Sequence, residues 1–150
     1  MKTALIRGMI CVVLAGFAAH AAARPPLPLD SRHPILGSWV LPIEHPRHGE
    51  CLETYYFRAD GTTLVTSAEE VAETVFEISP KPSRAGFYRW SEKLVKDNGK
   101  KDCSGKVSRV GSESVSYIRF LEDGERFIVC QEESLRACFG PFYRLQGQSL

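Results

Sequence analysis

The residues from Tyr117 to Arg144 constrain the fold of this chain most strongly. Two runs rich in aromatic and β-branched residues flank a Glu-Asp-Gly turn, and Cys130 and Cys138 bracket the loop that follows. Such runs suit a pleated, half-buried surface, and Asp-Gly supplies the positive φ that a tight hairpin needs. Because the same pattern recurs upstream, the sequence predicts an antiparallel β-meander.

The first residues have the layout of a secretion signal. Lys2 and Arg7 give residues 1–23 a basic start, an apolar stretch follows, and three alanines form a cleavage site of small residues. The apolar stretch is too short for a permanent membrane anchor. We therefore expect an exported protein that begins at Arg24, with the alanines of 19–21 as a second possible cleavage site.

The remaining chain reads as one domain between two flexible ends. Residues 24–34 contain four prolines and predict an extended, mobile leader, and residues 146–150 are expected to be a disordered tail. The mature chain of about 127 residues is long enough to bury a real core. We assign the β-barrel domain to residues 35–145.

Short strands with turn signals between them predict an all-β domain. Residues 67–72 are the exception, since Ser67-Ala68-Glu69-Glu70 fits a capping box and favours a helical turn before a strand that ends at Ser79. Residues 106–111 either pair or stay in a loop. From about eight strands we predict a single antiparallel up-and-down barrel. The other expected strands are 35–43, 51–58, 62–66, 86–95, 114–121, 125–130 and 138–145.

Four cysteines remain after the signal peptide is removed. An even number in an exported chain predicts two disulfides, and the absence of a C-x-x-C pair argues against zinc. We favour Cys130–Cys138 with Cys51–Cys103, and the alternative pairing is Cys103–Cys130 with Cys51–Cys138. In an up-and-down meander the loops at 43–50, 95–105 and 131–137 share one end, so all four cysteines are expected there.

Charge excludes one class of partner. The 19 basic side chains, less Lys2 and Arg7, face 18 acidic ones, which leaves a mature net charge of about −1. Nucleic-acid binders usually carry a basic stripe, so we expect no nucleic acid as partner. We expect no membrane association after signal cleavage, and a monomer.

No set of residues indicates an active site. The sequence lacks G-x-S-x-G, the mature cysteines are expected to be oxidised, and adjacent carboxylates such as Glu69-Glu70 are typical of solvated surface. His45 and His48 have no settled third ligand for a metal. We therefore predict no catalytic residue, no metal site and no cofactor.

Aromatic residues are the better clue to function, because there are too many for one small core face. Either one set fills the core and the rest is scattered on the surface, or some of them line a ligand cavity or an exposed protein-binding patch. The candidate ligand or partner contacts are Tyr55, Tyr88, Trp90, Tyr117 and Phe127.

Two elements of the sequence resemble the lipocalins and the wider calycin barrels. These are Gly37-Ser38-Trp39 on the first expected strand and Arg144 on the last. In that group the tryptophan packs against an arginine and closes one end of the barrel. The resemblance implies an eight-stranded up-and-down barrel with one ligand cavity, and Trp39 with Arg144 as its barrel-closing pair. The chain also resembles small periplasmic inhibitor barrels.

We therefore expect a periplasmic or secreted binding protein, and not an enzyme. The leading function is non-covalent capture of a small, partly apolar ligand inside the barrel. The alternative is an inhibitor or immunity-type protein that binds a periplasmic protein through the loops at 43–50, 95–105 and 131–137.

Overall fold

The computed structural model describes residues 29–45 and 49–146. The predicted signal peptide, the start of the leader and residues 147–150 of the tail lie outside this part. The described residues form eight strands and no helix. The strands are β1 (Gly37–His45), β2 (Gly49–Phe57), β3 (Thr62–Ser67), β4 (Glu70–Ile78), β5 (Tyr88–Asp97), β6 (Glu113–Phe120), β7 (Arg126–Cys130) and β8 (Cys138–Arg144).

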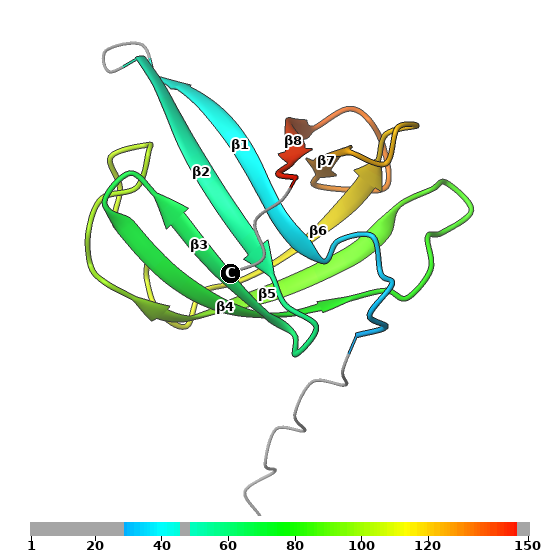
Figure 1. Ribbon diagram of the computed structural model, residues 1–150, viewed down its shortest axis with the longest axis horizontal. Helices are drawn as coiled ribbons and strands as arrows, with labels where there is room; N and C mark the ends of the chain where they lie inside the picture. The colour runs from blue at the N-terminus through cyan, green and yellow to red at the C-terminus, as the bar shows by residue number, and fades with distance from the viewer. Residues whose placement is uncertain (1–28, 46–48, 147–150) are drawn as a thin grey trace, which may run out of the picture.

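The strands form a closed antiparallel barrel in which each one pairs with its neighbours in sequence (Figure 1). β1 and β8 complete the ring where Trp39 faces Arg144 and Val40 faces Tyr143. The predicted up-and-down barrel is therefore confirmed. Connections β2–β3, β4–β5 and β6–β7 lie at one end, here called the turn end, and connections β3–β4, β5–β6 and β7–β8 lie at the opposite end, here called the loop end.

Both favoured disulfides are present, Cys51–Cys103 and Cys130–Cys138. All four cysteines lie at the loop end, as the alternation of the strands predicted. The second disulfide joins the facing residues of β7 and β8, while the first ties β2 to the long β5–β6 loop (residues 98–112).

The helical turn predicted for residues 67–72 is wrong. Ser67 pairs with Glu70, so Ala68 and Glu69 form a two-residue hairpin turn between β3 and β4. Burial alternates along β4, with Glu70, Ala72, Thr74 and Phe76 buried. This period of two buries one face of a strand, and it outweighs the local capping-box signal.

Ala68 adopts a backbone conformation that is unfavourable for alanine. Its φ of 52° is the only positive value among the described non-glycine residues. The left-handed region costs a residue with a Cβ atom roughly 1–2 kcal/mol, whereas glycine adopts it freely but loses more entropy on folding. We expect Ala68→Gly to raise the free energy of unfolding by about 0.5–1 kcal/mol in urea titrations. Ala59→Gly, in another exposed turn, is the control and should give no gain. An equal gain in both variants would contradict the explanation.

The turn-end half of the interior is filled with aromatic and aliphatic side chains. Phe127 stacks on Phe142 at 4.4 Å between ring centroids, and Trp39 meets Phe127 edge to face at 4.6 Å. Offset and edge-to-face pairs of this kind add to the stabilisation from buried area. The buried cluster consists of Ile35, Trp39, Leu41, Phe57, Phe76, Trp90, Ile118, Phe127, Val129 and Phe142.

The end of the proline-rich leader covers this aromatic core. Residues 29–36 (blue in Figure 1) lead into β1, and His33 and Ile35 are buried. His33 Nε2 lies 3.2 Å from the Ser79 carbonyl oxygen, and the Leu29 N–H donates to the Ala59 carbonyl. Part of the leader that was predicted to be mobile is therefore packed against the turn end.

The Gly-x-Trp motif and Arg144 meet in this region. The Arg144 guanidinium lies over the Trp39 ring at 4.1 Å from its centroid, and it donates to the carbonyl oxygens of Leu36 (3.0 Å) and Pro34 (2.7 Å). Gly37 has a φ of +105°, which residues with side chains rarely adopt, and this turns the chain so that both carbonyls face Arg144. The contact between Trp39 and Arg144 thus joins the first strand of the barrel to the last.

Candidate ligand-binding cavity

The loop-end half of the barrel is hollow, with a cavity of about 350 Å³. Strands β2 to β6 form its walls, and the β5–β6 loop contributes to its rim. This volume is at the lower end of the range for small-molecule sites. The lining residues are Glu53, Tyr55, Val65, Ser67, Glu70, Ala72, Thr74, Glu92, Leu94, Asp102, Ser108, Arg109, Ser112, Glu113 and Ser114.

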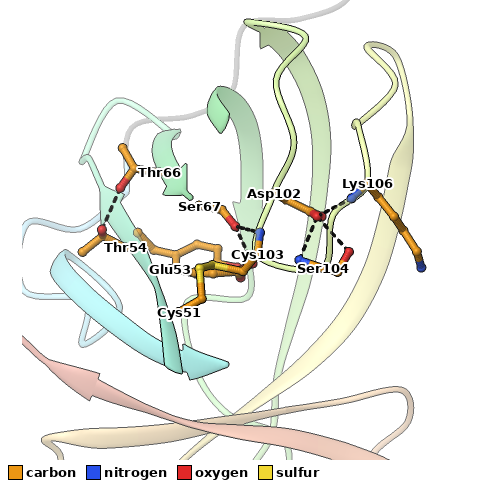
Figure 2. The surroundings of a disulfide bond; sticks show 10 residues. Cys51, Glu53, Thr54, Thr66, Ser67, Asp102, Cys103, Ser104 and Lys106 are labelled. Atoms are coloured by element: carbon orange, nitrogen blue, oxygen red, sulfur yellow. Dashed lines mark hydrogen bonds between the residues drawn. A yellow bond between two sulfur atoms is a disulfide. The ribbon is translucent and has the colours of Figure 1, made fainter. Parts of the chain in front are cut away.

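One wall is a hydrogen-bonded network beside the Cys51–Cys103 disulfide (Figure 2). Glu53 accepts hydrogen bonds from the Tyr55 hydroxyl and the Ser67 hydroxyl, both at 2.7 Å. Ser67 Oγ in turn accepts from the backbone N–H of Cys103 at 2.9 Å. Burial, followed by the nearby Glu53, raises the pKa of Tyr55 well above its ordinary value, so Tyr55 remains a hydrogen-bond donor. The network fixes the β5–β6 loop against β2 and β3.

Asp102 shapes the same loop. Its Oδ1 accepts hydrogen bonds from the backbone N–H groups of Ser104 (2.9 Å) and Lys106 (2.8 Å), and from the Ser104 hydroxyl (Figure 2). Aspartate side chains commonly order turns in this way. Hydrogen bonds therefore hold the loop at the rim of the cavity in a defined conformation, and Cys103 anchors it.

Glu70 is a buried acidic group in the cavity wall. Glu70 is the first residue of β4 and is only 5% exposed. Its Oε1 accepts no hydrogen bond from an N–H or hydroxyl group of the described residues. Asp97 lies on the neighbouring strand, where it faces Ala72 in register, and its Oδ2 is also buried without a partner. Burial raises the pKa of Glu70, and the Asp97 carboxyl beside it acts in the same direction. Buried polar atoms are nearly always hydrogen-bonded, and these two oxygens satisfy each other when the carboxyls share one proton, which is the form that the raised pKa of Glu70 favours.

Glu92 of β5 is the second acidic group on the inner wall. Burial raises its pKa from 4.5 to about 7, and the hydroxyls of Ser114 and Thr74 partly offset that rise. Ser114 Oγ donates to Glu92 Oε1 at 3.3 Å, whereas Thr74 Oγ1 lies near the carboxyl without hydrogen-bonding geometry to any protein atom. Near neutral pH this carboxyl is present in both its charged and neutral forms.

This raised pKa predicts how stability depends on pH. Below pH 4.5 the Glu92 carboxyl is protonated in both the folded and the unfolded protein. Between pH 4.5 and about 7 it ionises in the unfolded protein but stays protonated in the folded one. The free energy of unfolding should therefore fall by about 3 kcal/mol as pH rises through this interval, and Glu92 should cause no further fall above it. Because glutamine does not ionise, Glu92→Gln should be up to about 3 kcal/mol more stable than wild type at pH 8 and nearly equal to it at pH 4.

Urea titrations at both pH values measure this difference. Glu77→Gln is the matched control, since Glu77 is exposed on the outer face of β4. Glu70 contributes a slope of the same sign, so the Glu92→Gln variant should retain part of the pH dependence. An identical pH profile for Glu92→Gln and wild type would contradict the assignment of Glu92.

The structure separates the candidate contact residues that the sequence suggested. Tyr55 packs against the aromatic core and also lines the cavity, whereas Tyr88, Trp90 and Phe127 pack in or against the core alone. Tyr117 precedes the inward-facing Ile118 on β6 and therefore points outward. Of the five residues, only Tyr55 is positioned to contact a ligand in this cavity.

Sequence analysis missed the acidic residues of the cavity. The interpretation of Glu69-Glu70 as solvated surface is wrong for Glu70, which is buried, and holds for Glu69, which is exposed. A signal was available: Glu70, Ala72, Thr74 and Phe76 alternate with period two, so Phe76 in the core places Glu70 on the same inner face.

Comparison with protein-family models, with curated proteins and with solved structures finds no match to this chain. No helix in residues 29–45 and 49–146 is long and apolar enough to cross a membrane. The two disulfides are typical of a protein that resides in an oxidising, extracytoplasmic compartment.

Proposed function

We propose that this protein is an exported, lipocalin-like binding protein that captures a small ligand non-covalently in the barrel cavity. The observation that carries the proposal is the cavity of about 350 Å³, whose wall combines the carboxyls of Glu70 and Glu92 with the apolar side chains of Val65, Ala72 and Leu94. Largely pre-formed cavities with a few convergent polar groups are the usual form of small-molecule sites. The contact between Trp39 and Arg144 supports the likeness to lipocalins.

The periplasm, or the exterior of the cell, is the compartment that we propose. The layout of residues 1–23 and the two disulfides support it. We propose a binding role rather than a catalytic one, and the cavity wall that combines carboxyl groups with hydroxyls and apolar side chains is compatible with such a role. The apolar lining residues Val65, Ala72 and Leu94 suit a ligand that is partly apolar.

Native mass spectrometry of protein purified from the periplasm tests the proposal. Ala72→Phe places a ring in the cavity, and Val71→Phe adds the same ring to the exposed outer face of β4 as a control. Wild type and Val71→Phe should carry an extra mass of a few hundred daltons that organic extraction removes, and Ala72→Phe should not. A bare wild-type mass, or an adduct that Ala72→Phe retains, would overturn capture in the cavity.

The alternative is a protein partner, and one surface feature favours it. Leu135 in the β7–β8 connection and Phe139 on β8 are 62% and 54% exposed. They flank the Cys130–Cys138 disulfide at the loop end, and Leu135 belongs to the loop at 131–137 that the sequence suggested for such a contact. If the native mass of the wild type shows no bound small molecule, we expect Leu135→Ser and Phe139→Ser to weaken binding to a periplasmic protein and leave the fold intact.

A further inference from the structure

Residues 29–36, here called the strap, cross the turn end of the barrel and are held there by three contacts. The Leu29 N–H donates to the Ala59 carbonyl oxygen in the β2–β3 turn at 3.1 Å. Arg144 of β8 donates to two carbonyl oxygens of the strap. His33 makes the third contact, which joins the strap to the residue that follows β4 and to β5.

The neighbours of His33 determine where its ring carries a hydrogen. The Ser79 carbonyl oxygen can only accept, so Nε2 carries the hydrogen and donates to it at 3.2 Å. The Ile35 backbone N–H can only donate, so Nδ1 is the unprotonated nitrogen and accepts from it at 3.2 Å. The ring also packs edge to face with Tyr88 of β5, and His33 is only 6% exposed. The docked strap therefore requires the neutral imidazole with its hydrogen on Nε2.

A second proton on this ring is incompatible with the docked strap. It would bind to Nδ1 and point at the Ile35 N–H, so one hydrogen bond would be lost and two N–H groups would face each other. The charged ring would also remain almost out of water, which is costly without a partner. Ile35 is fully buried, and its carbonyl accepts from the Trp39 indole N–H at 2.7 Å. Moving Ile35 away from the new proton therefore uncovers the aromatic core.

The charges around His33 do little to hold an imidazolium in place. Asp30 is the one carboxylate among the described residues that acts on it, and Asp30 is exposed, with both oxygens already accepting from Arg32. From β5 the ring meets Tyr88, from the end of β4 a carbonyl oxygen, and β8 contributes only a positive charge to the strap. Burial lowers the pKa of His33 below its ordinary value of 6.5, and the hydrogen bond to the carbonyl and the charge of Asp30 only partly offset this.

We infer that the strap is an acid-sensitive switch, in which neutral His33 keeps residues 29–35 docked on the turn end, and protonation of Nδ1 releases them and uncovers the apolar cluster beneath Ile35. The switch lies at the end of the barrel opposite the cavity rim, so it is independent of the proposed ligand.

The sign of the pH dependence follows from the two forms of the strap. Above pH 6.5 His33 is neutral in both the docked and the released strap, so docking is strongest there. Below pH 6.5 the released strap takes up a proton and the docked strap does not. The ratio of released to docked strap should therefore rise about tenfold per pH unit, until the docked His33 is protonated as well. This is opposite to the effect of Glu92, which destabilises the fold as pH rises.

NMR of the isotope-labelled protein between pH 8 and pH 4 tests the switch. Heteronuclear NOE values report fast backbone motion residue by residue, and the ring nitrogen shifts report the protonation of His33. At pH 8 residues 29–35 should be as rigid as the strands, with the ring hydrogen on Nε2. At pH 4 the same residues should move freely while the strands stay rigid, and the Ile35 amide should shift as it loses its acceptor.

Two variants and a control assign the effect to His33. His33→Gln and His33→Phe cannot take up a proton, so the mobility of their straps should be the same at pH 8 and pH 4. Asp30→Asn removes the other titratable group of the strap and should keep the release in acid. A wild-type strap that is equally rigid at both pH values would overturn the inference. Acid release that both non-titrating variants retain, or motion that spreads through the whole barrel at the same pH, would overturn it as well.

Discussion

Trp39→Ala is expected to lower the free energy of unfolding by about 3–5 kcal/mol, the usual cost of truncating a buried aromatic residue. Trp39 is fully buried, and its indole N–H donates to the Ile35 carbonyl at 2.7 Å. Its ring contacts Phe127 and the Arg144 guanidinium, so alanine leaves a cavity and removes three kinds of contact. Single domains are stable by only about 5–15 kcal/mol, so the variant should unfold at a far lower urea concentration.

Arg144→Ala should cost about 2–3 kcal/mol, since it removes two hydrogen bonds from a charged donor and leaves the Pro34 and Leu36 carbonyls without it. Tyr143→Ala is the control on the same strand, because Tyr143 is 40% exposed and should change stability by about 1 kcal/mol or less. Far-UV circular dichroism in urea measures all three. If Trp39→Ala and Arg144→Ala both unfold at the wild-type midpoint, the pair does not close the barrel and the likeness to lipocalins loses its main support.

Removal of the Cys51–Cys103 disulfide is expected to cost about 4 kcal/mol. Its cysteines are 52 residues apart, and the entropy that a cross-link removes from the unfolded chain grows with the length of the closed loop. The double variant Cys51→Ser/Cys103→Ser should also loosen the β5–β6 loop, because Cys103 anchors it to β2. Urea titration gives the first effect, and faster amide exchange in residues 98–112 gives the second.

Cys130→Ser/Cys138→Ser is the internal comparison. These cysteines are only 8 residues apart, so the same relation predicts about 2.5 kcal/mol. β7 and β8 already pair beside this disulfide, so amide exchange in residues 98–112 should not change. A larger loss from this variant than from the first would contradict the loop-length explanation.

Local chemistry was enough to predict most of the fold. The turns at Ala59-Asp60-Gly61 and Glu122-Asp123-Gly124 fall where they were expected, between β2 and β3 and between β6 and β7. Because successive strands run in opposite directions, the position of a residue along the chain decides at which end of the barrel it lies. This is why the shared end of the cysteines followed from the sequence, which favoured the observed pairing and left a second one open.

The same reasoning failed where local and long-range signals disagree. The capping-box pattern at Ser67 is satisfied by a few neighbouring residues, whereas the strand that replaces it depends on pairing with β3 and β5. Contacts with strands distant in sequence are not visible in a short window. Glu70 lies in this stretch, and the interpretation of Glu69-Glu70 as solvated surface kept it out of the expected cavity.

The cavity was hard to predict for a further reason. Aromatic residues were the obvious candidates for ligand contact, but most of them fill the turn-end half and leave no space. Glu92 belongs to a strand whose outward positions are also charged, as Lys93 shows, so its composition does not reveal which charge is buried. The inward register of β5 becomes evident only when Trp90 is placed in the core.

The division of the barrel interior has a consequence for how such a chain can diverge. Residues that hold the fold together lie at one end, and those that line the cavity lie at the other, with few residues serving both ends. Selection can therefore alter charge and size in the hollow half while the aromatic half continues to supply the stability. A few substitutions on the inner faces of β4 and β5 would reshape the cavity in descendants of this chain without loss of the barrel.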